Sequence, residues 1–157
     1  SYVQTIVTAD QLAGMTEPIT AFAFNPVDGT NGNYFTHMSV WLSNVSDSVF
    51  TPDTFIYPDS AHAFQQVISD ADFTYTDGGW QIHGFDTAFT WDGHSNLLVS
   101  VARAHGQWSS GASFRVHNTP NRLRTMVRQS KNNSSFFIIV SFPFMNQSSA
   151  GKMASLT

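Results

Sequence analysis

The stretch that decides the fold of this chain covers residues 78–101 and reads GGWQIHGFDTAFTWDGHSNLLVSV. Trp80, Ile82 and, past Gly84, Phe85 are apolar positions that predict a first strand, and the alternating apolar residues of 97–101 predict a second. Asp92-Gly93 lies between them and predicts a tight turn, because glycine readily adopts the positive φ that such turns need. The stretch therefore predicts an antiparallel β-hairpin.

The composition agrees with a β protein exposed to the outside. The 157 residues are 41% hydrophobic and 14% aromatic, which is enough for the core of one domain covering residues 1–157. Charged residues make up only 11%, well below the usual proportion of about a quarter. Such a composition is typical of secreted and surface-exposed β proteins, so we expect an extracellular, cell-surface or virion-surface location. The absence of Cys excludes a disulfide framework and a thiolate zinc site.

Short apolar runs separated by turn residues occur along the whole chain and predict about ten strands. We expect the first of them to be an edge strand, and we expect one helical turn at Ala9–Gly14 with Asp10 as N-cap. Many short strands without a long helical period predict an antiparallel sandwich or barrel. Besides the two strands within 78–101, the expected strands are Tyr2–Thr8, Pro18–Phe24, Thr36–Leu42, Thr54–Tyr57, Phe64–Ile68, Asp72–Thr76, Ser113–His117, Leu123–Arg128 and Phe136–Phe144.

The apolar run Phe136–Phe144 is the longest in the chain, and it bears on membrane contact. It contains a Ser and a Pro and is far shorter than the about 20 residues that a membrane-spanning helix needs. We interpret it as a buried strand and expect no membrane insertion.

The charges are divided along the chain. All eleven acidic residues lie at or before Asp92, and all seven Lys and Arg residues lie at or after Arg103. One interpretation is that acidic and basic strands interleave in one sandwich and neutralise each other. The other is that the domain has an acidic pole and a basic pole, which would suit head-to-tail contact with copies of itself or with neighbours.

The order of these features resembles that of a family of secreted bacterial modules. The resemblance covers about residues 1–103 and includes the predicted hairpin. Its other elements are Gln4-Thr5-Ile6-Val7, Asp10-Gln11-Leu12-Ala13-Gly14, Ile19-Thr20-Ala21-Phe22-Ala23-Phe24 and Val40-Trp41-Leu42. The sequence is similar to accessory modules of Bacteroidetes-type adhesins and hemagglutinins and to some carbohydrate-binding modules, and similar modules occur on phage particles. The resemblance implies a jelly-roll-like β-sandwich and a non-catalytic binding or adhesion role, and it assigns no catalytic residue.

Catalytic and metal-binding patterns are weak in this sequence. The six His residues include no pair at i,i+2 or i,i+4, and no Gly-x-Ser-x-Gly nucleophile motif occurs. We therefore expect no enzyme activity and no transition-metal site. Asp70, Asp72 and Asp77 lie close together, but they do not match the calcium-loop template. We expect them to form a solvated acidic edge, with a structural calcium as the alternative and no other cofactor.

Exposed aromatic residues are the better ligand candidates. Trp91 and His94 flank the Asp92-Gly93 turn, and Trp108 lies in a Gly-rich polar loop, where an exposed indole must pack or bind something. Sugar rings stack on such faces, so we assign these three residues to ligand binding; the alternative for Trp108 is packing back onto the sandwich. We interpret Trp41 and Trp80 as core or sheet-face residues.

The basic residues after Arg103 form a second candidate surface. Arg115, Arg122, Arg124 and Arg128 are assigned to inter-subunit contact or anion binding. We expect no nucleic-acid partner, because the chain as a whole is acidic, with a pI near 5.7. The sequence thus predicts a non-catalytic adhesion or carbohydrate-binding module whose partner is a glycan or a surface protein. The alternative is a structural subunit of a filament, surface layer or virion, which uses its two charged halves to assemble with copies of itself or with particle neighbours.

Overall fold

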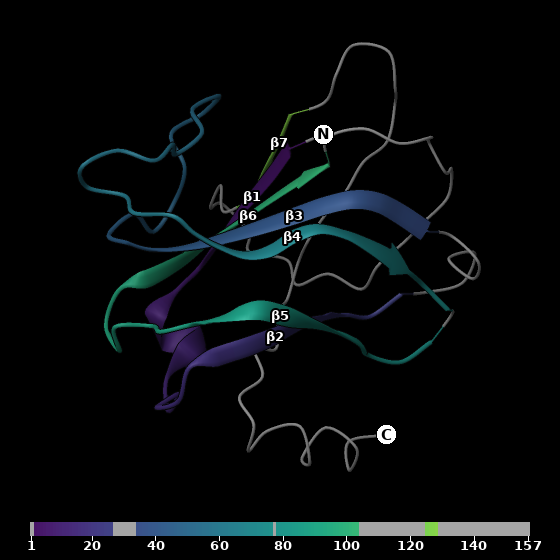
Figure 1. The fold of residues 1–157 in the computed structure, drawn as a ribbon. Coiled ribbons are helices and arrows are strands. Elements are labelled where there is room, and N and C mark those ends of the chain that lie inside the picture. Colours follow the sequence, from purple (N-terminus) through teal and green to yellow (C-terminus); the bar gives the residue numbers. More distant parts are fainter. Residues whose placement is uncertain (1, 27–33, 77, 104–124, 129–157) are drawn as a thin grey trace.

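The structure is a computed structural model that describes residues 2–26, 34–76, 78–103 and 125–128. Within these residues the chain is almost entirely β, with a single turn of 3₁₀ helix (Figure 1). The elements in chain order are β1 (Tyr2–Val7), η1 (Ala9–Leu12), β2 (Ile19–Phe24), β3 (Tyr34–Val45), β4 (Gln65–Thr74), β5 (Gln81–Phe89), β6 (Asn96–Arg103) and β7 (Thr125–Arg128).

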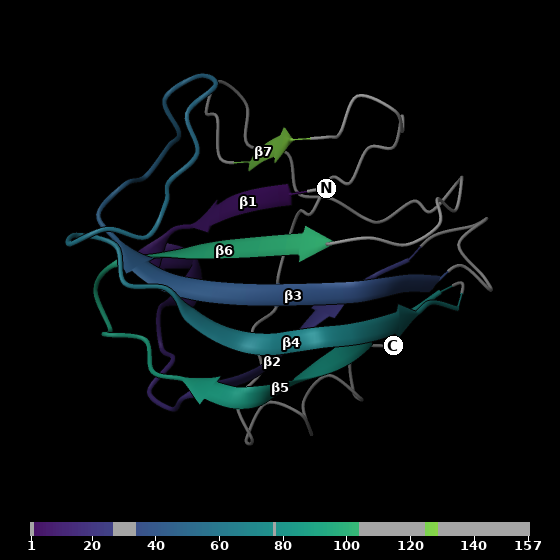
Figure 2. The ribbon, with the colours of Figure 1, turned by 45° about the horizontal axis from the view of Figure 1, so that its top comes forward.

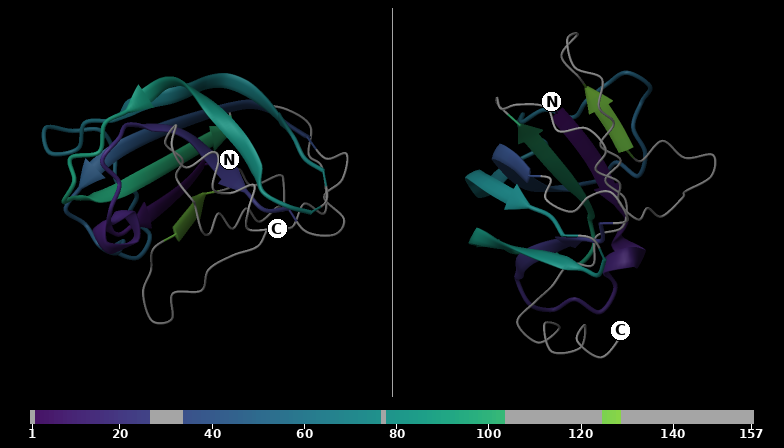
Figure 3. Two further views of the ribbon diagram at one scale, coloured as in Figure 1. Left: turned by 90° about the horizontal axis from the view of Figure 1, so that it is seen from below. Right: turned by 90° about the vertical axis from the view of Figure 1, so that its right-hand side faces the viewer.

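The strands form two antiparallel sheets that face each other. The larger sheet has the strand order β4-β3-β6-β1-β7, which Figure 2 shows face on, and the smaller sheet consists of β2 and β5. Figure 3 shows the two layers from two further sides. The predicted all-β antiparallel class is thus confirmed, with seven strands among the described residues instead of about ten.

Two of the expected strands are parts of a single strand, and a third expected segment is not a strand. The segments predicted at 64–68 and 72–76 belong to the continuous strand β4, which bulges at Asp70, where φ is 54°. A bulge accommodates the polar residues between them without ending the strand. The segment 54–57 is not a strand, because the backbone of Ile56 is bonded to the Gln4 side chain and not to another strand. The strands expected at 113–117 and 136–144 lie outside the described residues.

The predicted edge position of the first strand is wrong. β1 lies between β6 and β7, with Tyr2 opposite both Ala102 and Arg128. A β-branched run fits a central strand as well as an edge strand, so composition could not distinguish the two. The N-cap of the following helical turn is Thr8 and not Asp10, and the Gln11 side chain accepts a hydrogen bond from the Thr8 N–H at 3.1 Å.

The predicted hairpin at 78–101 is also wrong, although both of its strands exist. β5 pairs with β2 in the smaller sheet, whereas β6 pairs with β1 and β3 in the larger one. The turn at Asp92-Gly93, where Gly93 has φ 85°, therefore directs the chain from one sheet to the other.

Of the three apolar positions expected for the first strand of 78–101, Phe85 packs against the main core and the other two do not. Trp80 and Ile82, expected as the strand's apolar positions, are 41% and 53% exposed. His83 lies opposite the buried Phe22 of β2, so that it shares the inward face. Register thus decided which residues of β5 entered the core.

The edges of the two sheets meet along a β4–β5 seam that is joined by side chains. The Ser69 N–H donates to Oδ2 of Asp86 at 2.9 Å, and Nε2 of Gln65 donates to the Ala88 carbonyl at 2.8 Å. These side-chain bonds take the place of a backbone ladder between β4 and β5, which belong to different sheets. The sandwich is therefore closed along this edge by individual contacts (Figure 1).

Two apolar clusters lie on opposite faces of the larger sheet. The main core lies between the sheets and includes Val40 and Leu42 of β3 and Leu97, Val99 and Val101 of β6. A smaller cluster on the outer face joins Ile6, Val45, Phe50 and Leu98 and packs against Phe55, Ile56 and Phe64. The three last residues belong to residues 46–64, here called the outer loop, which rises on the side of the sheet away from β2 and β5 (Figure 1).

Candidate functional site

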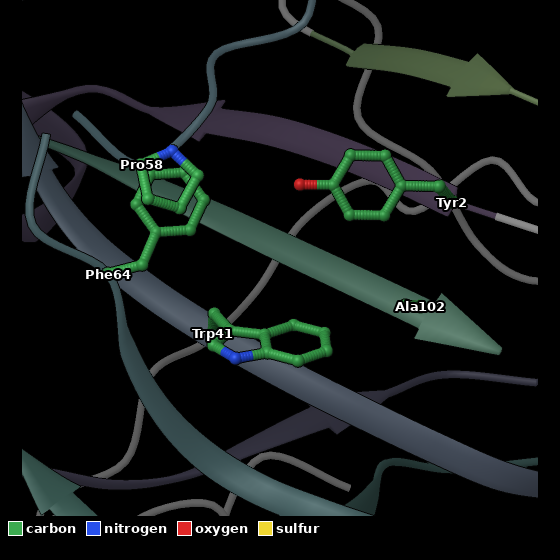
Figure 4. A pocket seen from close by; sticks show the side chains of 5 residues that line it. All are labelled: Tyr2, Trp41, Pro58, Phe64 and Ala102. Carbon is green, nitrogen blue, oxygen red and sulfur yellow. The ribbon is translucent and has the colours of Figure 1, made fainter. Parts of the chain in front are cut away.

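An aromatic groove lies on the outer face of the larger sheet. It has a volume of about 280 Å³ and is open to solvent on one side. Its lining comes from three strands and the outer loop, and consists of Tyr2, Trp41, Pro58, Phe64 and Ala102 (Figure 4). Tyr2 belongs to β1, Trp41 to β3 and Ala102 to β6, so that most of the groove stands on the rigid sheet.

The register of the sheet explains why a groove forms here. β6 lies between β1 and β3 and presents small residues to the outer face, with Ala102 opposite Tyr2 and Ser100 opposite Trp41. Two large rings therefore stand on either side of a strand whose outward side chains are short. The depression between them follows from this size difference.

The outer loop supplies the remaining wall, and Gln4 fixes its position. The Gln4 side chain is fully buried; its Oε1 accepts the Ile56 N–H at 2.9 Å, and its Nε2 donates to the Ile56 carbonyl at 2.6 Å. Nε2 also lies 2.9 Å from the Tyr2 hydroxyl oxygen and 3.0 Å from Oγ of Ser100. One buried amide thus links the loop to the tyrosine on the opposite wall.

Tyr2 brings a polar atom to a mostly apolar site. Figure 4 shows its hydroxyl directed toward Pro58 and Phe64. Burial raises the pKa of the Tyr2 phenol above its ordinary value, so the hydroxyl keeps its proton at neutral pH. The ring also contacts Phe55, with centroids 5.3 Å apart, and Phe55 in turn contacts the exposed Tyr57.

A tight turn at 59–62 connects Pro58 to Phe64. The Asp59 N–H donates to the His62 carbonyl at 3.2 Å, and Oδ1 of Asp59 accepts the Ala61 and His62 N–H groups. The His62 ring lies between two carboxylates, with Nδ1 2.8 Å from Asp59 and Nε2 3.3 Å from Asp47. Partial burial lowers the pKa of His62, but the hydrogen bonds to Asp59 and Asp47 outweigh it and raise the pKa above its ordinary value.

Another histidine, His83, lies in the main core among aromatic rings. Its ring centroid is 4.2 Å from that of Phe73, and Phe22, Phe24 and Tyr75 surround it at 5.5–5.7 Å. Nε2 is buried without a hydrogen-bond partner among the described residues. Burial lowers the pKa of His83 to about 4, so the ring is neutral at physiological pH.

The structure places the predicted ligand residues Trp91 and His94 away from the groove. Trp91 is half-buried against the main core, and its Nε1 donates to the Ser95 carbonyl at 2.8 Å. His94 is 80% exposed beside Asp92, whose carboxylate accepts the N–H groups of His94 and Ser95. The two residues share a turn but do not line the aromatic groove. The predicted ligand residue Trp108 lies outside the described residues.

The predicted basic surface is for the most part not described. Arg115, Arg122 and Arg124 lie outside the described residues, and Arg128 is placed only as the last position of β7.

The acidic residues considered for calcium take part in hydrogen bonds within the fold. Oδ1 of Asp70 lies 2.7 Å from Nδ1 of His37, and Asp72 accepts the His37 N–H at 3.1 Å; Asp77 lies outside the described residues. Across the described ranges, no group of three or more His, Asp or Glu side chains could hold a metal ion.

Comparison with known proteins finds no match among protein-family models, curated proteins or solved structures. The part of the chain that the structure covers contains no helix that is both long and apolar enough to cross a membrane. The site is therefore interpreted from its own residues.

Sequence reasoning did not find the groove. The sequence predicts strands that contain Tyr2, Trp41 and Phe64, and it gives no reason to bring them together with Pro58. The available signal was the second face of β6, where Ser100 and Ala102 alternate with the apolar residues of the core. Such small outward residues indicate a depression only when the neighbouring strands are known.

Proposed function

We propose that this chain is a non-catalytic carbohydrate-binding module and that the aromatic groove holds the sugar. The observation that carries the proposal is the pair of rings, Tyr2 and Trp41, on either side of the small Ala102. Sugar rings have apolar C–H faces that pack on aromatic side chains, while their hydroxyls need polar partners. A mostly apolar groove with a few placed polar groups matches this requirement.

The size of the groove supports a short glycan segment as ligand. Its volume of about 280 Å³ lies just below the range of about 300–1,000 Å³ that holds drug-sized molecules. The Tyr2 hydroxyl faces the groove and offers a hydrogen bond to a sugar hydroxyl (Figure 4). The groove is open on one side, so a longer chain could continue past it.

The side chains that line the groove carry no charge, which suits a neutral glycan. Asp59 follows the wall residue Pro58 directly. Among the side chains that the structure describes, Arg103 is the one Lys or Arg, and its guanidinium lies over the Phe35 ring of the core at 5.5 Å. A neutral glycan needs no charged partner in this lining, and Arg128 occupies the position opposite Tyr2 on the neighbouring strand β7.

The proposed setting is outside the cell or on a particle surface, where the module would serve adhesion. The low proportion of charged residues and the resemblance of residues 1–103 to secreted adhesin modules support this setting. The same resemblance supports a jelly-roll type for the sandwich.

The experiment is a glycan array probed with the wild-type chain and two matched tryptophan variants. Trp41→Ala should lower the signal on neutral glycans by at least about tenfold, equivalent to about 1.4 kcal/mol. Trp80→Ala also removes a partly exposed indole, but from the outside of the groove, and should leave the signal unchanged. The absence of any neutral-glycan signal from the wild type, or an equal loss in both variants, would overturn the proposal.

Assembly into a larger structure is the second candidate, and the charge distribution favours it. Eight of the nine acidic residues that the structure describes are exposed, and the ninth, Asp47, is half-buried. All basic residues other than Arg103 follow it in the sequence. If these exposed acidic residues bind the basic segments of a neighbouring copy, the protein should form oligomers at low ionic strength that dissociate as salt is added. A monomer at low salt and high concentration excludes this candidate.

A further inference from the structure

His62 holds together the turn that joins two wall residues of the groove. Pro58 precedes the turn and Phe64 follows it, and both line the groove. Nδ1 of His62 faces Oδ1 of Asp59 at 2.8 Å within the turn. Nε2 faces Oδ2 of Asp47 at 3.3 Å, outside the turn.

Only the protonated imidazole can make both contacts as a donor. A neutral imidazole has one N–H, whereas the imidazolium has two. A carboxylate accepts hydrogen bonds and cannot donate one when ionised. When His62 loses its proton, one of its ring nitrogens carries no hydrogen. The lone pair of that nitrogen then faces a lone pair of a carboxylate oxygen, and no hydrogen bond forms between them.

The second carboxylate is anchored to the sheet and not to the turn. The Asp47 carbonyl accepts Nδ2 of Asn96, the first residue of β6, at 2.9 Å. The contact between His62 and Asp47 thus ties the turn to the start of β6. The outer loop is also attached at Ile56 by Gln4, which does not titrate, and by the packing of Phe55, Ile56 and Phe64 on the outer-face cluster.

We propose that His62 is a proton-controlled latch on the groove wall. When protonated, His62 holds the 58–64 segment in place, and when neutral, it releases this segment. The inference rests on the proposed function, because it concerns regulation of the same groove. Asp47 and Asp59 are the ionisable groups in contact with His62, and the raised pKa of His62 agrees with this placement. The latch is closed below the ordinary pKa of histidine, about 6.5, and opens as the pH rises through the raised pKa of His62.

The latch is tested without any ligand by NMR on the full chain. The ¹³Cε1 shift of His62 gives its titration midpoint, and amide exchange at 59–64, corrected for the intrinsic pH dependence, reports on the turn. We expect protection of these amides to fall by about fivefold or more as the pH rises through the titration midpoint of His62. His62→Gln should abolish this transition and Asp47→Asn should shift it to lower pH. His94→Gln is the matched control, because His94 is exposed on another turn, and it should leave the transition unchanged.

A second arm uses cellohexaose as the probe, titrated by calorimetry at about pH 6 and pH 8.5. A dissociation constant that rises at least about threefold at the higher pH in wild type but not in His62→Gln supports the latch. Equal affinity at both values, or exchange at 59–64 without a transition, overturns it. If cellohexaose binds at neither pH, the result counts against the proposed glycan binding by the groove. The exchange data then decide by themselves whether the latch exists.

Discussion

The side-chain amide of Gln4 bonds to both backbone groups of Ile56, 52 positions later in the chain. Through this one side chain, strand β1 and the outer loop keep a fixed separation. Gln4 also lies within hydrogen-bond distance of the Tyr2 hydroxyl, so that it positions residues on two walls of the aromatic groove. It is a positioning residue that has no place in the lining itself.

Replacing Gln4 by Leu should therefore destabilise the whole domain. Leu has a similar volume but leaves the Ile56 N–H and carbonyl and the Ser100 hydroxyl without this partner. We expect the free energy of unfolding to fall by about 2–4 kcal/mol, measured by denaturant titration. Gln66→Leu is the control, because Gln66 is exposed on β4, and it should change stability by less than about 0.5 kcal/mol. Equal effects of the two variants would show that the buried amide is not important for stability.

Trp91 and Trp41 should respond differently to substitution. Trp91→Phe keeps a ring against the core but removes the bond from Nε1 to the Ser95 carbonyl, which should cost about 1 kcal/mol of stability. Glycan binding should be unchanged, because Trp91 does not line the groove. If Trp91→Phe lowers the glycan signal as much as Trp41→Ala does, the binding site lies at the Asp92-Gly93 turn and not in the groove.

Stability should decrease on mild acidification because of His83. The folded-state pKa is about 4, below the ordinary value of 6.5, so the unfolded state takes up the proton first. The stability that neutral His83 provides is complete above about pH 6.5 and is lost as the pH falls toward 4. Because the ring is only partly buried, we expect a loss of about 1–3 kcal/mol, read from denaturant midpoints across this range. His83→Phe should flatten the profile, and an unchanged slope would contradict the assignment.

The β4–β5 seam should open when Asp86 is truncated. Asp86→Ala removes the acceptor of the Ser69 N–H, and we expect a loss of about 1 kcal/mol together with faster hydrogen exchange at the Ser69 amide. Asp86→Asn keeps a carbonyl oxygen at the same position and should retain most of the protection. If Ser69 exchanges equally fast in all three proteins, Asp86 does not hold the seam.

Local patterns in the sequence identified strands well but not their partners. The apolar patterns over 97–101 and 36–42 correctly predicted strands, which belong to β6 and β3. These patterns report which residues avoid water. They contain no information on which strand lies alongside, so the connection at Asp92-Gly93 was interpreted as a hairpin although it crosses between sheets.

The groove could not be predicted for the same reason. It depends on Tyr2, Trp41 and Ala102 meeting across three strands that are far apart in sequence. The inward position of His83 likewise follows from its register with Phe22, and composition would have placed Ile82 there instead. The composition predicted an all-β protein, whereas the position of the groove depends on which strands pair with each other.

The central position of β1 has a consequence for biosynthesis. Its partners are β6 and β7, at residues 96–103 and 125–128, so β1 leaves the ribosome well before the strands that pair with it. Until then an apolar, β-branched segment with two unpaired edges is open to other chains. We expect slow folding dominated by non-local pairing. A nascent chain stalled before residue 96 would carry the Tyr2 and Gln4 parts of the groove with neither strand partner of β1.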